Sequence, residues 1–213
     1  MLSFEQSLQH APRIDGDKPL LIYKVGILGS APLDFMPELA KKYAMPYVSS
    51  DKIRHDLMVE RQAQGMSPAM AQDVQSRSVQ HAVHRQAGRH LAEGGDVVVD
   101  MFVNNPKGRT SMHNIAQRRG GLAIGLVLNT PMQQALERVE AWTEAEEFEP
   151  PVNRWPHPPM SITRAMGRHI VRPQRSEGGL FLDVDGTGTT QDLLDQVEAH
   201  FHAADLKGRS GNV

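Results

Sequence analysis

Short apolar runs alternate along most of the chain with segments whose apolar positions have helical spacing. The runs predict buried strands at residues 19–28, 46–50, 96–103, 122–129 and 179–186. The intervening segments predict helices at residues 35–45, 51–65, 68–93, 105–121, 130–142, 161–170 and 189–206. Because strands that alternate with helices indicate a parallel sheet, we predict an α/β fold of three layers, with helices on both faces.

Changes in composition and periodicity divide the chain into one domain and two terminal segments. Residues 19–206 form the predicted domain, after a polar leader at 1–18 and before a tail at 207–213. Residues 143–160 are acidic and then rich in proline, without periodicity, so we expect an irregular excursion there.

Composition narrows the cellular setting. The chain of 213 residues has a net charge of −2 and no cysteine. A disulfide scaffold and a cysteine nucleophile are therefore excluded, and a reducing compartment is expected. The first residues lack the pattern of a signal peptide, and no apolar run approaches the roughly 20 residues needed to span a bilayer. We expect a cytoplasmic protein with no membrane partner.

Ligands of such folds bind at the carboxyl ends of the strands. The residues to inspect are therefore those that follow the strands, namely Gly26 to Asp34, Ser49 to Arg54, Asp100 to Asn105 and Asn129 to Pro131.

Motifs at these strand ends carry a family resemblance. They read, in chain order, "VGILGS", "SSDKIRHDL", "VVVDMFVNNPKGR", "LNTPMQQALERVEAW" and "MSITRAMGRHIVRP". In this order and spacing they resemble the P-loop kinases that include polynucleotide kinases and zeta-toxin-like kinases, over about residues 19–205. The resemblance implies a P-loop-kinase-like fold with a small helical lid at about residues 138–178.

The phosphate-binding loop departs from the family pattern Gly-x-x-x-x-Gly-Lys-Ser/Thr. If Gly26 is the first glycine, then Ala31, Pro32 and Leu33 stand where the family has glycine, lysine and the hydroxyl residue. Pro32 has neither a backbone N–H for phosphate nor a cation, and Leu33 has no hydroxyl for magnesium. Asp34 adds negative charge where triphosphate charge would gather. The loop is therefore predicted to be a degenerate Walker A loop.

The resemblance also assigns roles to single residues. Asp51 matches the base that accepts the proton of the attacking hydroxyl, and Arg54 the arginine that holds the substrate phosphate. Arg138 matches a catalytic lid arginine, and Asp100 is the candidate magnesium ligand. The remaining candidates are Gly26, Gly29, Ser30 and Lys24 for nucleotide binding and Arg164 and Arg168 for anion binding by the lid.

Each assignment has a structural alternative. "SAPLD" is a good helix start, with Pro32 as the first helical residue and Asp34 satisfying free N–H groups in the first turn. Asp51 is equally a helix N-cap, and Lys24 is equally a strand-edge lysine that reaches solvent. Arg109 is expected on a basic helix face that is either solvated or in contact with a phosphate backbone.

Three functions follow. The first is a pseudokinase, or a nucleotide- or nucleic-acid-binding protein, in which binding of ATP and Mg²⁺ is weak or lost. The second is an active phosphotransferase that acts on a nucleic acid or nucleotide through a divergent donor site. The third is a scaffold subunit for a protein partner. The sequence leaves open whether the protein is an enzyme.

Overall fold

A computed structural model describes residues 18–67, 70, 76–148, 160–168, 170–177 and 179–203. The predicted leader before residue 18, the proline-rich residues 149–159 and the predicted tail lie outside the described residues. The strands are β1 (Leu20–Val25), β2 (Tyr47–Ser49), β3 (Val97–Phe102), β4 (Leu122–Asn129) and β5 (Leu180–Asp185). The described helices are α2 (Phe35–Lys42), α3 (Ser50–Ala63), α5 (Ser76–Ala92), α6 (Pro106–Gln117), α7 (Met132–Phe148), α8 (Met160–Gly167) and α9 (Thr190–Ala203), with a 3₁₀ turn, η1, at Arg175–Glu177.

All five strands pair in parallel in the order β2-β3-β1-β4-β5. β1 is therefore the central strand, with β3 on one side and β4 on the other. The carboxyl ends of all strands meet at one edge of the sheet, which we call the carboxyl edge.

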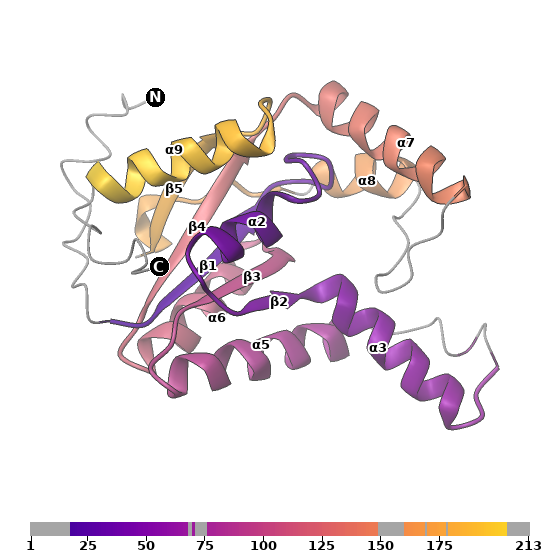
Figure 1. Cartoon of the computed structure of the whole chain (residues 1–213), viewed down its shortest axis with the longest axis horizontal. Helices are drawn as coiled ribbons and strands as arrows, with labels where there is room; N and C mark the ends of the chain where they lie inside the picture. Colours follow the sequence, from indigo (N-terminus) through magenta and orange to yellow (C-terminus); the bar gives the residue numbers. More distant parts are fainter. Residues whose placement is uncertain are drawn as a thin grey trace.

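Helices cover both faces of this sheet, as the alternating pattern predicts (Figure 1). Alternate residues of β1 serve the two faces because side chains alternate along a strand. Leu20 and Ile22 join the core beneath α2 and α9, whereas Leu21, Tyr23 and Val25 join the core beneath α3, α5 and α6. The three-layer α/β fold is thus confirmed.

The carboxyl edge carries two further elements. Helices α7 and α8 pack together beyond the ends of β1 and β4 (Figure 1). The chain then returns toward β5 through a segment that we call the strap, residues 170–177, of which all are described. No helix in the described part of the chain is long and apolar enough to cross a membrane.

Two sequence expectations need correction. The acidic residues 143–148 continue α7 as helix and do not begin an irregular excursion. In addition, α2 begins at Phe35, because Leu33 and Asp34 form a turn in which the Phe35 N–H donates to the Pro32 carbonyl at 3.2 Å. Pro32 is therefore not the first helical residue.

Candidate active site

The carboxyl edge brings the predicted segments together. The loop between β1 and α2 follows the central strand, and the turn after β3 lies beside it. The Gly26 N–H donates to the Asn104 side-chain oxygen at 3.0 Å, which joins the two segments directly. The neighbouring Asn105 caps α6 by accepting from the Gly108 N–H at 2.8 Å.

The loop between β1 and α2 packs against the helix that follows β4. Gly29 has φ +84°, and a Cβ atom at this position would lie 2.0 Å from the Ala135 carbonyl oxygen of α7. Only glycine fits such a conformation and such a close approach. Ser30 is buried, and its carbonyl accepts from the Thr130 hydroxyl at 2.7 Å. The middle of the loop is therefore held down by the protein itself.

Arg138 reinforces this packing from α7. Its guanidinium donates to the Gly29 carbonyl at 3.2 Å and the Gly186 carbonyl at 2.6 Å. It also donates to the carbonyls of Thr187 and Gly188, at 2.9 and 3.2 Å. The predicted lid arginine thus ties the loop to the turn between β5 and α9. Its catalytic role stays a prediction, because its donors already have backbone partners.

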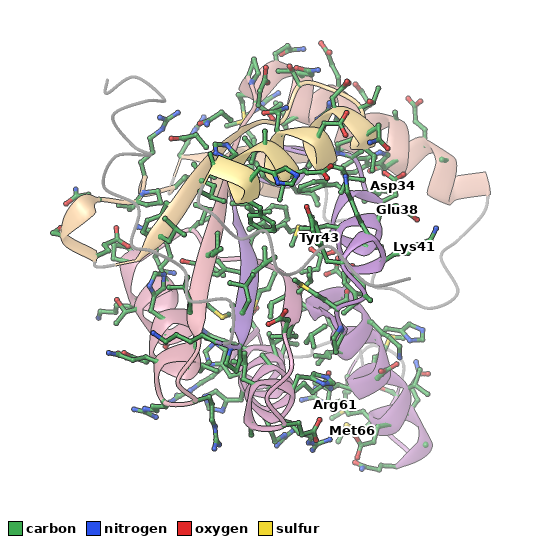
Figure 2. All side chains as sticks on the ribbon, turned by 60° about the vertical axis from the view of Figure 1, so that its left-hand side comes forward. Asp34, Glu38, Lys41, Tyr43, Arg61 and Met66 are labelled. Atoms are coloured by element: carbon green, nitrogen blue, oxygen red, sulfur yellow. The ribbon has the colours of Figure 1, made fainter. Side chains whose placement is uncertain are left out.

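Asp34 does not cap α2. It stands at the N-cap position, but its side chain makes no capping hydrogen bond. It accepts instead from the Thr190 hydroxyl at 2.5 Å, at the start of α9. Figure 2 shows Asp34 with Glu38 and Lys41 along α2. The sequence expectation that Asp34 satisfies free N–H groups in the first turn is therefore wrong.

Lys24 and Asp100 form an ion pair between β1 and β3, with side chains only 15% and 16% exposed. The Lys24 ammonium also lies 4.0 Å from the centre of the Phe102 ring. The Tyr47 hydroxyl donates to the second Asp100 oxygen at 2.5 Å. Partial burial and the Asp100 carboxylate raise the pKa of the Tyr47 phenol well above its ordinary value. Both oxygens of the candidate magnesium ligand are thus engaged by neighbouring side chains.

This arrangement corrects the alternative reading of Lys24 as a strand-edge lysine. Its strand is central in the sheet, and its ammonium is paired and mostly buried. The sequence reading also overlooked Tyr47, the aromatic residue that begins β2.

The predicted acceptor residues lie on α3, after β2. Ser49 is the N-cap of this helix, since its hydroxyl accepts from the Lys52 N–H at 3.3 Å. Asp51 is exposed in the first turn, so the N-cap reading of Asp51 is wrong. Arg54 is half-buried and approaches the Ser76 hydroxyl of α5 at 3.5 Å. Their predicted roles as base and phosphate ligand stay predictions.

The lid arginines differ in their surroundings. Arg164 lies on α8 and Arg168 directly after it, and both are exposed. Arg172 lies in the strap, where its guanidinium donates to the Asn129 side-chain oxygen at 2.9 Å. Anion binding by Arg164 and Arg168 stays a prediction.

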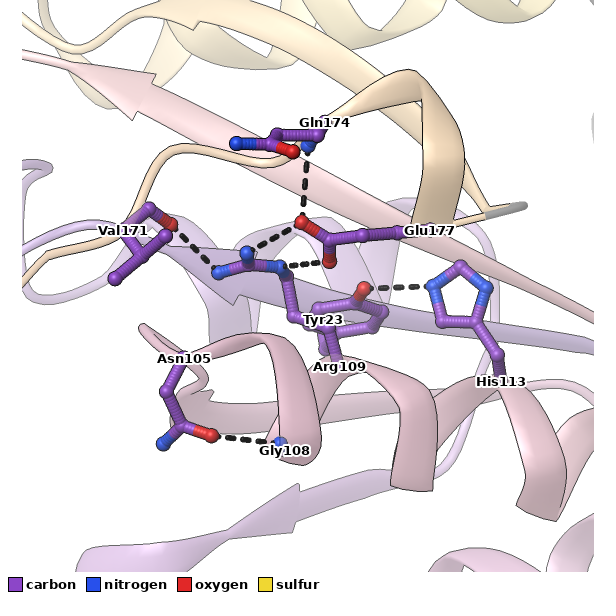
Figure 3. A network of polar contacts seen from close by, with 8 residues as sticks. All are labelled: Tyr23, Asn105, Gly108, Arg109, His113, Val171, Gln174 and Glu177. Atoms are coloured by element: carbon purple, nitrogen blue, oxygen red, sulfur yellow. Dashed lines mark hydrogen bonds and ion pairs between the residues drawn. The ribbon is translucent and has the colours of Figure 1, made fainter.

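Arg109 anchors the strap from α6 and is fully buried, so the expectation of a solvated face is wrong. Its guanidinium makes two hydrogen bonds of 2.7 Å to Glu177 and one of 2.8 Å to the Val171 carbonyl (Figure 3). The Arg109 hydrogen bonds lower the pKa of Glu177. Beside them, the Tyr23 hydroxyl and His113 Nε2 lie 2.8 Å apart, and burial lowers the pKa of His113. A glutamate 68 residues away in the chain gave no local signal for this pair.

A P-loop kinase fold implies ATP and magnesium as ligands, and several groups near the loop already have partners within the protein. Loop N–H groups of Gly26 and Ser30 have internal partners, Asn104 and the Ile27 carbonyl. The lysine and hydroxyl positions hold Pro32 and Leu33.

Comparison with known proteins identifies the family. Residues 21–156, well over half of the chain, match the AAA domain family. The chain belongs to the AAA domain family. No curated protein shows significant similarity to this AAA domain protein.

Solved structures resemble it in fold. A candidate kinase from Chloroflexus aurantiacus J-10-fl is 17% identical, with a TM-score of 0.61 over 88% of this chain and 98% of that one. A gluconokinase from Sinorhizobium meliloti 1021 is 14% identical, with a TM-score of 0.54 over 92% and 98% of the two chains. An unliganded sugar kinase from Janibacter sp. HTCC2649 is 11% identical, with a TM-score of 0.57 over 92% and 99%. The fold is therefore that of P-loop kinases.

Proposed function

We propose that this AAA domain protein is a pseudokinase, which keeps the kinase fold but has lost ordinary phosphoryl transfer from magnesium-ATP. One observation carries the proposal: the side chains that would bind ATP and magnesium are instead bonded to other groups of the protein. Arg138 binds four backbone carbonyls, and Lys24 and Tyr47 occupy the carboxylate of Asp100.

The physical reason is charge. Phosphoryl transfer relies on cations that neutralise the phosphates and the charge of the transition state. Here the lysine position of the loop is Pro32, and the nearby Lys24 is already neutralised by Asp100. Asp34 adds a carboxylate at the start of α2. A triphosphate would therefore meet repulsion where the family supplies attraction.

The structural neighbours support the kinase ancestry and leave the acceptor open. They include a gluconokinase and a sugar kinase, whereas the sequence motifs favour a nucleic acid or nucleotide. Fold alone does not decide between these acceptors. An activity test must therefore include both gluconate and an oligonucleotide with a free 5′ hydroxyl.

Restoration of the loop tests the proposal. The variant Ala31→Gly/Pro32→Lys/Leu33→Ser should bind ATP at least about tenfold more tightly than wild type, since the three groups act as one unit. The matched control Ala31→Gly/Pro32→Gln/Leu33→Ser has the same backbone freedom without the cation, and should gain much less. Wild type should transfer no labelled γ-phosphate to water, gluconate or the oligonucleotide.

The two other hypotheses give different results. Turnover by wild type that is abolished in Asp51→Asn would establish an active phosphotransferase with a divergent donor site. A protein that binds no nucleotide even after restoration would instead support the scaffold hypothesis.

A further inference from the structure

A cavity of about 150 Å³ lies at the carboxyl ends of β1 and β4, beneath the strap. Its lining is mostly apolar and includes Val25, Ile27, Val127, Leu128, Ile170 and Pro173. A protein cavity of this volume with such a lining holds a molecule of about the size of benzene. The space thus suits a compact apolar group and is too small for a nucleoside triphosphate.

The roof of the cavity is fixed by the buried network around Arg109. The Val171 N–H donates to the Asn104 carbonyl at 3.0 Å, and the Val171 carbonyl accepts from Arg109 at 2.8 Å. The Val171 side chain is exposed, and its neighbours Ile170 and Arg172 line the cavity. This is the alternation expected of an extended segment. The roof therefore holds its position without a ligand.

One charged group marks the cavity. Of the described residues that line it, Arg172 alone carries a charge. The Asn129 amide orients the guanidinium, because its oxygen accepts from Arg172 at 2.9 Å while its nitrogen donates to Asp183 at 2.8 Å. In the described structure no carboxylate pairs with Arg172, although Asp183 lies on the far side of the amide. The hydrogen bond to Asn129 uses one of the five guanidinium N–H groups of Arg172.

We propose that this cavity binds a small monoanion with an apolar body, such as an aromatic or branched-chain carboxylate. The carboxylate accepts hydrogen bonds from Arg172, and the body lies among the apolar side chains beneath the strap. A guanidinium matches a carboxylate in a bidentate manner. A phosphate dianion is disfavoured, because one cation in an apolar lining would not offset its desolvation. The proposal does not depend on whether ATP binds, since neither ATP nor magnesium takes part.

Benzoate serves as the probe, with benzyl alcohol as its neutral counterpart and inorganic phosphate as an anion without an apolar body. Titrations followed by NMR of the protein methyl groups should show saturable binding of benzoate in the millimolar range or tighter. Benzoate should bind about tenfold or more better than benzyl alcohol, as a charge-assisted hydrogen bond implies. Phosphate should bind more weakly than benzoate.

Three variants locate the site. Arg172→Gln should remove the preference for benzoate over benzyl alcohol. Arg119→Gln, an equal change at an exposed arginine that does not line the cavity, should leave it intact. Ile170→Trp should fill the cavity from the roof and abolish binding of both compounds.

Several results would overturn the proposal: no saturable benzoate binding by folded wild type, phosphate binding as tight as benzoate, or equal losses in the two arginine variants. Because Arg172 is exposed, its substitution tests the proposal even if Ile170→Trp does not fold. Success or failure here leaves the ATP-binding result of the pseudokinase proposal unaffected.

Discussion

The loop between β1 and α2 and the predicted acceptor segment at the start of α3 lie at the same edge of one sheet, yet their polar groups bond to different parts of the chain. In the loop between β1 and α2, the carbonyls of Gly29 and Ser30 and the carboxylate of Asp34 all accept hydrogen bonds from other parts of the chain. In the acceptor segment, Ser49 caps α3, and Asp51 stays exposed in the first turn.

In the pseudokinase that we propose, contacts within the protein stabilise the loop in place of a bound phosphate donor. A functional phosphate loop leaves N–H groups and a cation for its ligand, which is a cost to stability in the free protein. Here the N–H groups of Gly26 and Ser30 donate to the Asn104 side chain and the Ile27 carbonyl.

The largest effect should come from Arg138→Met. Loss of the guanidinium leaves the carbonyls of Gly29 and Gly186 without their donor and separates the loop from the turn before α9. Charge-assisted hydrogen bonds contribute about 1.5–3 kcal/mol each to stability, but they are not additive. We expect the free energy of unfolding in urea to fall by roughly 3 kcal/mol. A fall below about 0.5 kcal/mol, as for an ordinary surface residue, would mean that the loop is not held from within.

The pair of Lys24 and Asp100 should show the next largest effect. Lys24→Met and Asp100→Asn should each destabilise the protein, because each leaves a mostly buried charge without its partner. The double variant should be more stable than the sum of the single changes implies, by roughly 2 kcal/mol. Unfolding curves of all four proteins give this coupling energy. An additive result would show that the ion pair does not occupy Asp100 in solution.

The pH dependence of stability tests the burial of His113, which lies beside the network that anchors the strap. Because burial lowers the pKa of His113, the native state binds this proton less readily than the unfolded chain. Stability should therefore be fully present above the ordinary histidine pKa of about 6.5 and should fall as the pH drops below it. Thermal unfolding between neutral and mildly acidic pH should show this slope. The variant His113→Gln should show a smaller slope of stability against pH. Part of the slope should remain in both proteins, because burial also lowers the pKa of His84. An unchanged slope in His113→Gln would contradict the assignment.

The smallest effect should come from Asp51→Asn in the acceptor segment. Asp51 is exposed and is not the N-cap, and asparagine keeps a side-chain oxygen, so the change chiefly removes a negative charge near the start of α3. The free energy of unfolding should fall by less than about 1 kcal/mol. A stability of the Asp51→Asn variant close to wild type in urea would agree with this. A loss as large as that of Arg138→Met would end the contrast between the two regions.

The sequence predicted the fold well because burial dominates strand patterns. The run at residues 122–129 matches β4 residue for residue, since both faces of this inner strand are covered. The sequence also predicted that the segments after the strands meet at one edge of the sheet, because the strands are parallel. The start of α2 at Phe35 matches the helix predicted at residues 35–45, whereas the alternative reading of Pro32 as its first residue was wrong.

The site was harder to predict because its contacts are long-range. Local spacing placed Arg109 on a basic helix face, but its partner Glu177 lies far along the chain. The position of Lys24 could not be judged without the strand order, which makes β1 central. Arg138 was placed correctly at the carboxyl edge, but no sequence pattern reveals that its donors meet backbone carbonyls.

Calorimetric titration of wild type with ATP, with and without magnesium, tests the central claim most directly. The closed loop predicts no binding in the micromolar range and no gain in affinity when magnesium is added, because Asp34 repels the phosphates and Asp100 is already paired. A dissociation constant in the low micromolar range that depends on magnesium, and that is lost in a Gly29 or Ser30 variant that still folds, would contradict the account.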